Sequence, residues 1–397
     1  MMSPRRLYLD NAATSFPKPK AVLDAMVRYA TELGASAGRG GYHEAVETGR
    51  LIHECRSRIN RLIGGVRPEQ VAFTLNCSDA LNLAIKGLID PASRSHTICT
   101  HLDHNSILRP LNALQDRGLI EQTRVEADRQ TGLVDPQAIR RAIRPDTRLI
   151  AITHVSNVTG TVQALREIGK IARECAVPLI VDAAQSIGHV PIDVQADCVD
   201  LLAVPGHKGL LGPLGTGFLY IRPGLEKLLR PLKEGGTGSV SEVDRQPDAL
   251  PDKYESGSQN AIGIIGLSEG VKWVIDQTVE KLHAQEMDLV RTFIEGVSNV
   301  EGVTYFGPQG VRSRIGVFSV RADGFDPHEL SAVLETSFGL LTRSGIHCAP
   351  LAHATIGTLA TGGTTRFSFG PFLSKQDVKF ATDALADVVA SGVAGRV

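Results

Sequence analysis

Hydrophobic and polar residues alternate along this chain in a way that predicts strands separated by helices. Short apolar runs rich in β-branched residues end abruptly at polar or glycine-rich segments, which is typical of buried strands. Between them lie longer segments whose apolar positions recur with the spacing of an amphipathic helix. The predicted strands are 71–75, 97–100, 148–153, 178–182, 199–204 and 218–221, and the predicted helices include 17–33, 43–63, 136–144 and 164–175.

The order of these elements predicts the kind of sheet. Strand and helix alternate over 71–221, which favours a parallel sheet that is covered by helices and binds its ligand at the carboxyl ends of the strands. The periodicity is lost over 231–260, and a long helix is expected over 261–299. The sequence therefore predicts a large domain over 17–260 and a smaller domain of strands and helices built from 1–16 and 261–397.

Charge and cysteine content narrow the functional class. The chain has 397 residues and a formal net charge of −1, so its charge indicates neither a nucleic acid nor an anionic membrane as a partner. Its first twenty residues contain no apolar signal core, and no run of about 18 apolar residues occurs, so a cytoplasmic protein is expected. The six cysteines are scattered without a CxxC pair, which favours reduced thiols over a metal site or a disulfide framework.

Lys208 follows the apolar run 199–204 at a point where a strand cannot continue. A lysine at a strand end is open to partial desolvation, which lowers the pKa of its amine and frees the neutral form that carbonyl chemistry needs. By itself, a lysine is more often a solvated surface residue. Asp182, at the end of the strand 178–182, changes this interpretation. Pyridoxal phosphate needs both groups, because a lysine binds its aldehyde and an acid keeps its ring nitrogen protonated.

The motifs around these two residues resemble those of a known family. The motif DxxQ at 182–185 and the motif GHK at 206–208 resemble the class V aminotransferases, and further motifs point to the branch of cysteine desulfurases and selenocysteine lyases. The resemblance extends from residue 8 to about residue 374. It implies an α/β fold of the pyridoxal-phosphate transferase type I, with a large parallel or mixed sheet and a smaller α+β domain. It also implies pyridoxal 5′-phosphate as the cofactor and a homodimer.

The resemblance assigns a role to each marked residue. His104 matches the family histidine that stacks on the cofactor ring, and Asn157 matches the asparagine beside its phenolic oxygen and the substrate carboxylate. Ser258 is expected to reach a cofactor phosphate across the dimer interface. The expected catalytic residues are Lys208, His104 and Cys348, and the expected cofactor-binding residues are Cys77, Ser78, His104, Asn157, Asp182, Gln185, His207, Lys208 and Ser258.

Two motifs in the carboxyl-terminal part decide the predicted reaction. The segment 343–348 has the R-x-G-x-x-C form of the second group of cysteine desulfurases. An exposed Cys348 beside His347 and Arg343 favours a lowered thiol pKa, although free cysteines are more often buried and inert. Arg366 lies in an apolar, strand-like stretch and needs a charged partner. The resemblance supplies the substrate carboxylate as that partner, with Arg343 and Asn157 as further substrate contacts, and a structural ion pair is the alternative.

These assignments predict a cysteine desulfurase that converts L-cysteine into L-alanine and leaves a persulfide on Cys348. A sulfur-acceptor protein or a thiol reductant then collects the sulfur. Selenocysteine lyase and a β-eliminating cysteine lyase share Lys208, Asp182 and Arg366, so only dependence on Cys348 separates these three enzymes. A scaffold without chemistry is a further alternative, which the intact Lys208 disfavours. The preference between L-cysteine and L-selenocysteine and the destination of the sulfur, iron–sulfur cluster assembly among others, stay open.

Overall fold

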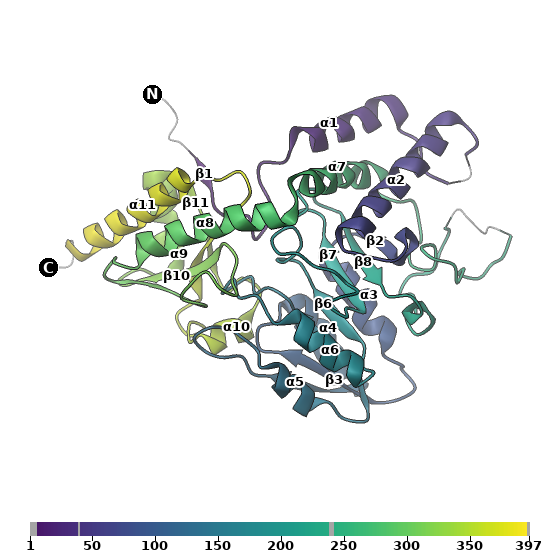
Figure 1. Ribbon diagram of the computed structural model, residues 1–397, viewed down its shortest axis with the longest axis horizontal. Helices are drawn as coiled ribbons and strands as arrows, with labels where there is room; N and C mark the ends of the chain where they lie inside the picture. Colours follow the sequence, from purple (N-terminus) through teal and green to yellow (C-terminus); the bar gives the residue numbers. More distant parts are fainter. Residues whose placement is uncertain (1–5, 39, 238–241, 395–397) are drawn as a thin grey trace.

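The computed structural model describes residues 6–38, 40–237 and 242–394, which form a large and a small lobe (Figure 1). The large lobe is built on a seven-stranded sheet in the order β2-β8-β7-β6-β5-β3-β4. Five neighbouring strands are parallel, whereas β8 is antiparallel to both of its neighbours, so the sheet is mixed rather than purely parallel. The strands are β2 (Val71–Thr74), β3 (Ser95–Thr100), β4 (Ile120–Val125), β5 (Thr147–Thr153), β6 (Leu179–Asp182), β7 (Leu201–Pro205) and β8 (Gly217–Ile221).

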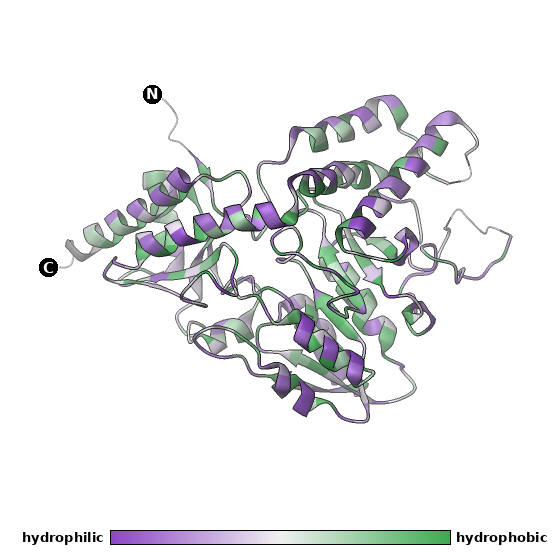
Figure 2. Ribbon diagram, in the orientation of Figure 1, coloured by the Kyte–Doolittle hydropathy of each residue, from purple (hydrophilic) through white to green (hydrophobic). Residues whose placement is uncertain are grey.

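Helices cover both faces of this sheet, because its side chains point alternately into two apolar layers. Along β6, Leu179 and Val181 pack into one layer and Ile180 into the other. Figure 2 shows the hydrophobic strands inside and the hydrophilic outer faces of helices such as α6. The helices of this lobe are α1 (Lys20–Arg28), which a π-helical turn (Tyr29–Leu33) extends, α2 (His43–Leu62), α3 (Cys77–Leu88), α4 (Asn105–Asp116), α5 (Pro136–Ala142), α6 (Leu165–Glu174) and α7 (Ala261–Gln277), with short 3-10 helices at Pro68–Gln70 and Leu225–Lys227.

The small lobe has its own sheet and its own core. Four antiparallel strands run in the order β12-β13-β10-β9, and the amino-terminal β1 (Leu7–Tyr8) pairs with β11 (Leu340–Leu341). Aromatic rings fill the core, where the ring of Phe293 lies 4.2 Å from that of Phe318. The remaining elements are β9 (Val303–Tyr305), β10 (Val317–Ala322), β12 (Arg343–Gly345), β13 (Thr364–Ser368), α8 (Val279–Val297), α9 (Pro327–Phe338), α10 (Pro350–Thr355) and α11 (Lys375–Ala394).

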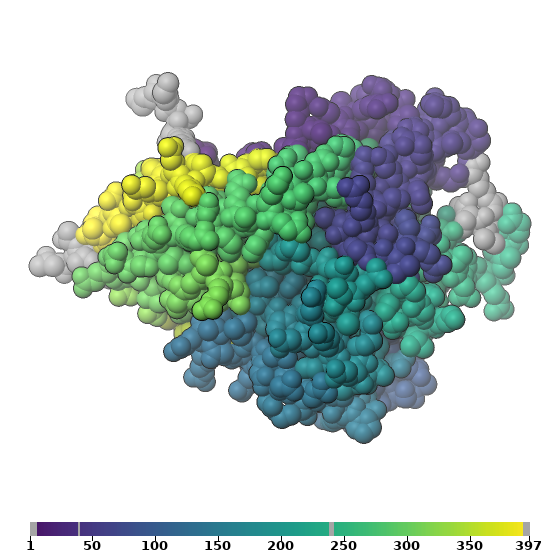
Figure 3. Space-filling view, viewed as in Figure 1, coloured from purple at the N-terminus to yellow at the C-terminus, as the bar shows by residue number. Residues whose placement is uncertain are grey.

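The single helix expected over 261–299 is wrong, because the structure has two helices that meet at Thr278. The φ of Thr278 is 62°, which no α-helix continues through. The apolar side chains of α7, such as Ile264 and Leu267, belong to a layer of the large sheet, whereas those of α8 from Met287 onward belong to the small-lobe core. We propose on this packing that the domain boundary lies at Thr278 rather than at residue 261. In the space-filling view the two lobes meet along a continuous contact (Figure 3).

The predicted strands and helices of the large lobe occur close to their expected bounds. The strand β4 was not predicted, because an edge strand with the polar sequence IEQTRV has no continuous apolar run. Among the described residues, no helix is both long and apolar enough to cross a lipid bilayer.

Candidate active site

The carboxyl ends of β3, β5, β6 and β7 meet at one edge of the large sheet, as parallel neighbours require. A cavity of about 280 Å³ lies at this edge. Each predicted site residue in this cavity ends a strand, follows one or begins the next helix. The fold thereby brings together residues that are up to 131 positions apart (208 minus 77). The predicted residues that line the cavity are Cys77, Ser78, His104, Asn157, Asp182, Gln185, His207 and Lys208.

Lys208 lies just beyond β7, and its amine is the only lysine amine in the wall of this cavity among the described residues. Burial lowers the pKa of Lys208, against the opposing attraction of the Asp182 carboxylate. A lowered pKa increases the fraction of neutral amine, which is the form that attacks an aldehyde. The environment of Lys208 therefore suits imine chemistry.

Asp182 is the last residue of β6 and is almost completely buried. Its Oδ1 accepts hydrogen bonds from the Ala184 amide at 2.9 Å and from the Cys77 thiol at 3.4 Å. Burial and the neighbouring carboxylate raise the pKa of Cys77, so this thiol stays protonated and acts as a donor. A carboxylate held in this way at the cavity wall is the partner that a protonated pyridine nitrogen needs.

His104 caps the amino terminus of α4. Its Nδ1 accepts a hydrogen bond from the Ser106 amide at 3.1 Å, and burial lowers the pKa of the ring to about 4. The ring is therefore a neutral, oriented imidazole, which suits stacking on an aromatic ring. Ser106 also contacts the hydroxyl of Ser78 at 2.7 Å, which links this histidine to the amino terminus of α3.

Two polar atoms in the wall are buried and have no hydrogen-bond partner among the described residues: Oδ1 of Asn157 and Nδ1 of His207. Burying a polar atom without a partner is costly, so such atoms mark places where a ligand is expected to bind. The amino terminus of α3, with the hydroxyl of Ser78, adds a site that favours an anion. An amine, an acid and an anion site around one cavity fit the aldehyde, ring nitrogen and phosphate of pyridoxal phosphate.

The amide groups of Asn157 and Gln185 are partly committed to the protein itself. Asn157 donates to the carbonyl of His347 at 2.6 Å, so the atom it leaves free is an acceptor. Gln185 donates to the carbonyl of Ala12 at 2.8 Å and thereby ties the amino-terminal segment to the cavity. These contacts connect the cavity wall directly with two distant segments of the chain.

Ser258 does not lie in the Lys208 cavity of its own chain. It is exposed and lines two surface hollows, one of which it shares with Thr74 and Lys233. Within one chain, Ser258 therefore lies apart from the predicted residues that line the Lys208 cavity.

Cys348 is exposed, in the turn between β12 and α10. The proposed reason for a lowered thiol pKa needs one correction. His347 is buried, and burial lowers the pKa of its ring to about 2, so this histidine carries no positive charge to stabilise a thiolate. Arg343, the first residue of β12, lies four positions before His347 and five before Cys348, is exposed, and makes no ion pair with any described residue.

Arg366 is buried in β13 of the small lobe and contacts Asn157 of the large lobe. Its Nη2 donates to the Asp10 carboxylate at 2.6 Å and its Nη1 donates to the Asn157 carbonyl at 3.3 Å. A structural ion pair, the alternative weighed for this arginine, is therefore present. Its buried Nε has no partner in the described part of the chain, so the guanidinium keeps an unused donor.

Sequence reasoning missed several residues that support the site. Asp103 is buried and accepts from the amides of Thr100 and Thr153, both at 2.6 Å, which joins the ends of β3 and β5 beside His104. Burial raises the pKa of Asp103 to about 7. An acid near the end of an apolar strand was the available signal, as it was for Asp182.

The amino-terminal segment contacts the backbone next to Lys208. The carbonyl of His207 accepts from the amide and hydroxyl of Ser15, both at 3.0 Å, and from the amine of Lys18 at 2.9 Å. This carbonyl belongs to the peptide bond that precedes Lys208. No local pattern in the sequence predicts this contact, because the two segments are about 190 residues apart.

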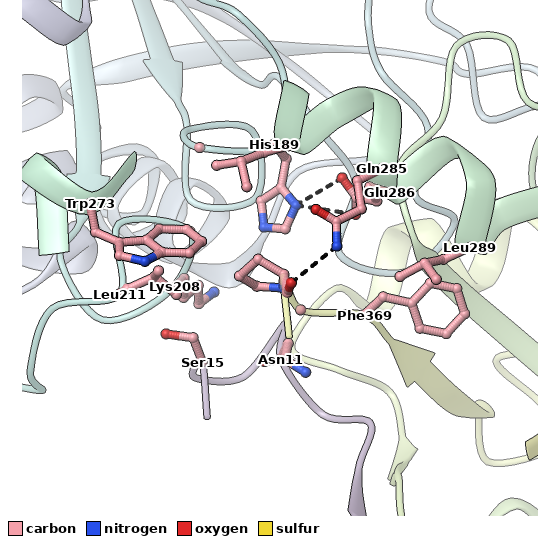
Figure 4. A pocket seen from close by; sticks show the side chains of 15 residues that line it. Asn11, Ser15, His189, Lys208, Leu211, Trp273, Gln285, Glu286, Leu289 and Phe369 are labelled. Atoms are coloured by element: carbon pink, nitrogen blue, oxygen red, sulfur yellow. Dashed lines mark hydrogen bonds and ion pairs between the residues drawn. The ribbon is translucent and has the colours of Figure 1, made fainter. Parts of the chain in front are cut away.

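A second pocket reaches Lys208 from between the lobes (Figure 4). Trp273 and Lys208 line it from the large lobe, and Phe369 lines it from the small lobe. Nδ1 of His189 lies 3.1 Å from both carboxylate oxygens of Glu286. Burial alone would lower the pKa of His189, but the Glu286 carboxylate outweighs it and the pKa is raised. This ion pair joins the loop after β6 to α8.

The model of the class V aminotransferases matches residues 7–380. The chain belongs to the class V aminotransferase family. It is 35% identical to a probable cysteine desulfurase of Methanothermobacter thermautotrophicus, over 97% of this chain and 95% of that protein. The apo structure of a cysteine desulfurase from Thermococcus onnurineus superposes with a TM-score of 0.91 at 32% identity, covering 97% of this chain and 95% of the other. The cysteine desulfurase CsdA of Escherichia coli gives 0.86 at 26% identity, covering 98% and 95%.

These similarities confirm the family and the fold class that the motifs predicted. The α/β architecture with a large mixed sheet and a smaller lobe is that of the type I pyridoxal-phosphate transferases. The roles of individual residues stay predictions, which the geometry above makes testable.

Proposed function

We propose that this chain is a pyridoxal-phosphate-dependent cysteine desulfurase. One observation carries the proposal: the exposed Cys348 turn is bonded to the wall of the Lys208 cavity. Asn157, which lines the cavity, donates to the His347 carbonyl, and the Asn105 amide, next to His104, donates to the Cys348 carbonyl at 2.8 Å. The turn that carries the thiol is thereby tied to the cavity that holds the amine and the acid that pyridoxal phosphate requires.

The residues divide the reaction among them. Asp182 would hold the ring nitrogen of bound pyridoxal phosphate protonated, and the cofactor would then supply an electron sink for the substrate carbon. Lys208 moves the α-proton, and Arg366 orients the substrate carboxylate through its free donor. The Cys348 thiolate forms a sulfur–sulfur bond while the carbon–sulfur bond of cysteine breaks. The carbon that has lost its sulfur is then protonated, and the product leaves as alanine.

Two further parts of the proposal concern partners. Ser258 is exposed and apart from its own cavity, which supports a role across the interface of a homodimer. Cys348 is exposed, which supports direct transfer of its sulfur to an acceptor protein or a small thiol. The cytoplasmic location stays a prediction from the amino-terminal sequence.

The test is an incubation of the cofactor-loaded protein with L-cysteine, followed by assays of alanine, sulfide and pyruvate in the same sample. Alanine in step with sulfur on Cys348, detected by mass spectrometry without reductant, is the expected result. Pyruvate with sulfide would instead mean β-elimination. Turnover of L-selenocysteine but not of L-cysteine would indicate a selenocysteine lyase.

A further inference from the structure

The turn that carries Cys348 has a backbone that its own residues disfavour. In this cysteine turn, residues 346–349, the Ala349 amide donates to the Ile346 carbonyl at 3.1 Å. The two central residues, His347 and Cys348, have φ values of 53° and 58°. Tight turns with positive φ at both central positions favour glycine and asparagine, because other side chains are crowded there. The surrounding contacts must therefore hold this turn in place.

Two of these contacts reach the large lobe. The His347 carbonyl accepts from the Asn157 side chain at 2.6 Å, and the Cys348 carbonyl accepts from the Asn105 amide at 2.8 Å. They set where the turn lies relative to the cavity. They leave the side chain of His347 to be placed by other groups.

The ring of His347 is held by a chain of hydrogen bonds that has only one possible direction. A carbonyl oxygen only accepts, so the contact of His347 Nε2 with the Arg343 carbonyl at 3.2 Å requires a proton on Nε2. In the neutral ring, Nδ1 of His347 is then an acceptor. It accepts from Nε2 of His353, at 3.2 Å. Nδ1 of His353 accepts in turn from the hydroxyl of Thr358, at 2.7 Å.

Both rings are in the protonation state that this chain of bonds requires. His353 and Thr358 are fully buried and His347 nearly so. Burial, together with the charge of Arg366, lowers the pKa of His347 to about 2 and that of His353 to about 4. Neutral rings with fixed tautomers therefore connect the interior of the small lobe to the carbonyl of Arg343, in the strand β12 that leads into the cysteine turn.

We propose that His353 and Thr358, acting through His347, are positioning residues that aim the Cys348 thiol for sulfur transfer. We call these three residues the histidine relay. The proposal rests on the proposed function, because it needs Cys348 to receive the sulfur. None of the three relay residues lines the Lys208 cavity, so loss of the relay is expected to slow the transfer step and to leave substrate binding intact.

The test compares His353→Leu with His353→Gln. Leucine removes the donor to His347, whereas the glutamine amide is able to keep it. In single turnover with L-cysteine, His353→Leu should form the Cys348 persulfide about 10- to 100-fold more slowly, the cost typical of a misplaced reacting group. The cysteine concentration that half-saturates the change in cofactor absorbance should stay within about twofold in both variants, because the binding groups are unchanged. His353→Gln should recover most of the transfer rate.

A milder pair protects the test against misfolding. Thr358→Val removes the hydroxyl at the end of the histidine relay, and Thr358→Ser keeps it. Valine should slow persulfide formation by a smaller factor than His353→Leu, and serine should restore it. A transfer rate like that of the wild type in both His353→Leu and Thr358→Val would overturn the proposal. So would a loss of cysteine binding in proportion to the loss of rate.

The same experiment separates failure of the histidine relay from failure of the proposed function. If the wild-type chain acquires no sulfur on Cys348, the proposed function is wrong, and the relay has no transfer step to serve. If the wild type acquires sulfur on Cys348 and His353→Leu does so equally fast, only the positioning role is wrong.

Discussion

Lys208 and Cys348, the two reactive side chains of the site, are held by different kinds of structure. Lys208 follows β7, a strand with hydrogen-bonded neighbours on both sides, and the preceding carbonyl is bonded to the amino-terminal segment. Cys348 follows β12, a three-residue strand at the edge of the small sheet, and lies on a turn with two positive φ values. The lysine is thus placed by the core of the fold, whereas the thiol depends on a few long-range hydrogen bonds.

This difference predicts where substitutions at a distance are harmful. Lys208 follows a strand that is hydrogen-bonded to a neighbour on each side, so we expect the loss of any single side chain outside the cavity to shift it little. The cysteine turn has few supports, and each one is a named side chain or amide. The two ends of the site should therefore respond differently when their reactive groups and supports are removed.

The largest effect is expected at the Lys208 end. Lys208→Ala removes the amine that holds the cofactor aldehyde, so the visible absorption band that borohydride reduces should disappear. Alanine formation should fall by about 10⁴-fold or more, because covalent attachment and proton transfer are lost together. Absorbance spectra before and after borohydride check this. A yellow, borohydride-reducible variant would contradict the role of Lys208.

Removal of the Cys348 thiol should leave binding of the cofactor and of L-cysteine intact. Cys348→Ala keeps Lys208, Asp182 and Arg366, so the cofactor band and its change on adding L-cysteine should remain. Alanine release should fall by about 10³-fold, because a nucleophile is lost. The matched control is Cys175→Ala, which removes a thiol outside the site and should change nothing. Full cysteine activity in Cys348→Ala would leave a lyase in place of a desulfurase.

Arg366 should affect substrate binding rather than binding of the cofactor. For Arg366→Ala, the loss of a charge-assisted contact with the carboxylate should cost about 2–4 kcal/mol, or a factor of about 30 to 1,000 in kcat/KM. The cofactor band should persist, which shows that the variant folds. Arg321→Ala, which changes an exposed arginine of β10 in the same small sheet, is the control and should have little effect. An unchanged kcat/KM in Arg366→Ala would leave this arginine only its structural ion pair with Asp10.

The smallest effect is expected in the pH dependence of stability that His353 causes in the small lobe. Burial, with a contribution from Arg366, lowers the pKa of His353 to about 4, whereas an unfolded histidine titrates near about 6.5. Between these values the unfolded chain binds a proton that the folded chain does not. The contribution of the neutral His353 ring to the free energy of unfolding is therefore fully present above about pH 6.5, and it is lost as the pH falls toward about 4.

Chemical denaturation at two pH values measures this effect. In His353→Gln, the difference in unfolding free energy between about pH 7.5 and pH 5 should shrink by about 1–2 kcal/mol relative to the wild type. His328→Gln changes an exposed histidine whose ring contacts the hydroxyl of Ser344, and this matched control should leave the difference nearly unchanged. An unchanged difference in His353→Gln would mean that His353 is not buried as a neutral ring.

The strand ends of the large lobe could be predicted from the sequence because the signal is local. An apolar run followed by a polar or glycine-rich segment marks both the strand and its end, and parallel neighbours bring those ends to one edge. Asp182, Lys208 and His104 were found in this way, and the family motifs supplied the roles. The edge strand β4 and the break at Thr278 lacked such a signal, since neither interrupts a local pattern in a recognisable way.

Only the tertiary structure decided which polar side chains are buried and what they contact. Arg366 pairs with Asp10, 356 positions away, and His347 is a buried link to His353 rather than a charged neighbour of Cys348. Hydrophobic periodicity depends on residues a few positions apart, and it is therefore visible in the sequence. Burial, pKa and hydrogen-bond partners depend on segments that meet only after folding, and for that reason the support of the Cys348 thiol became apparent only in the folded chain.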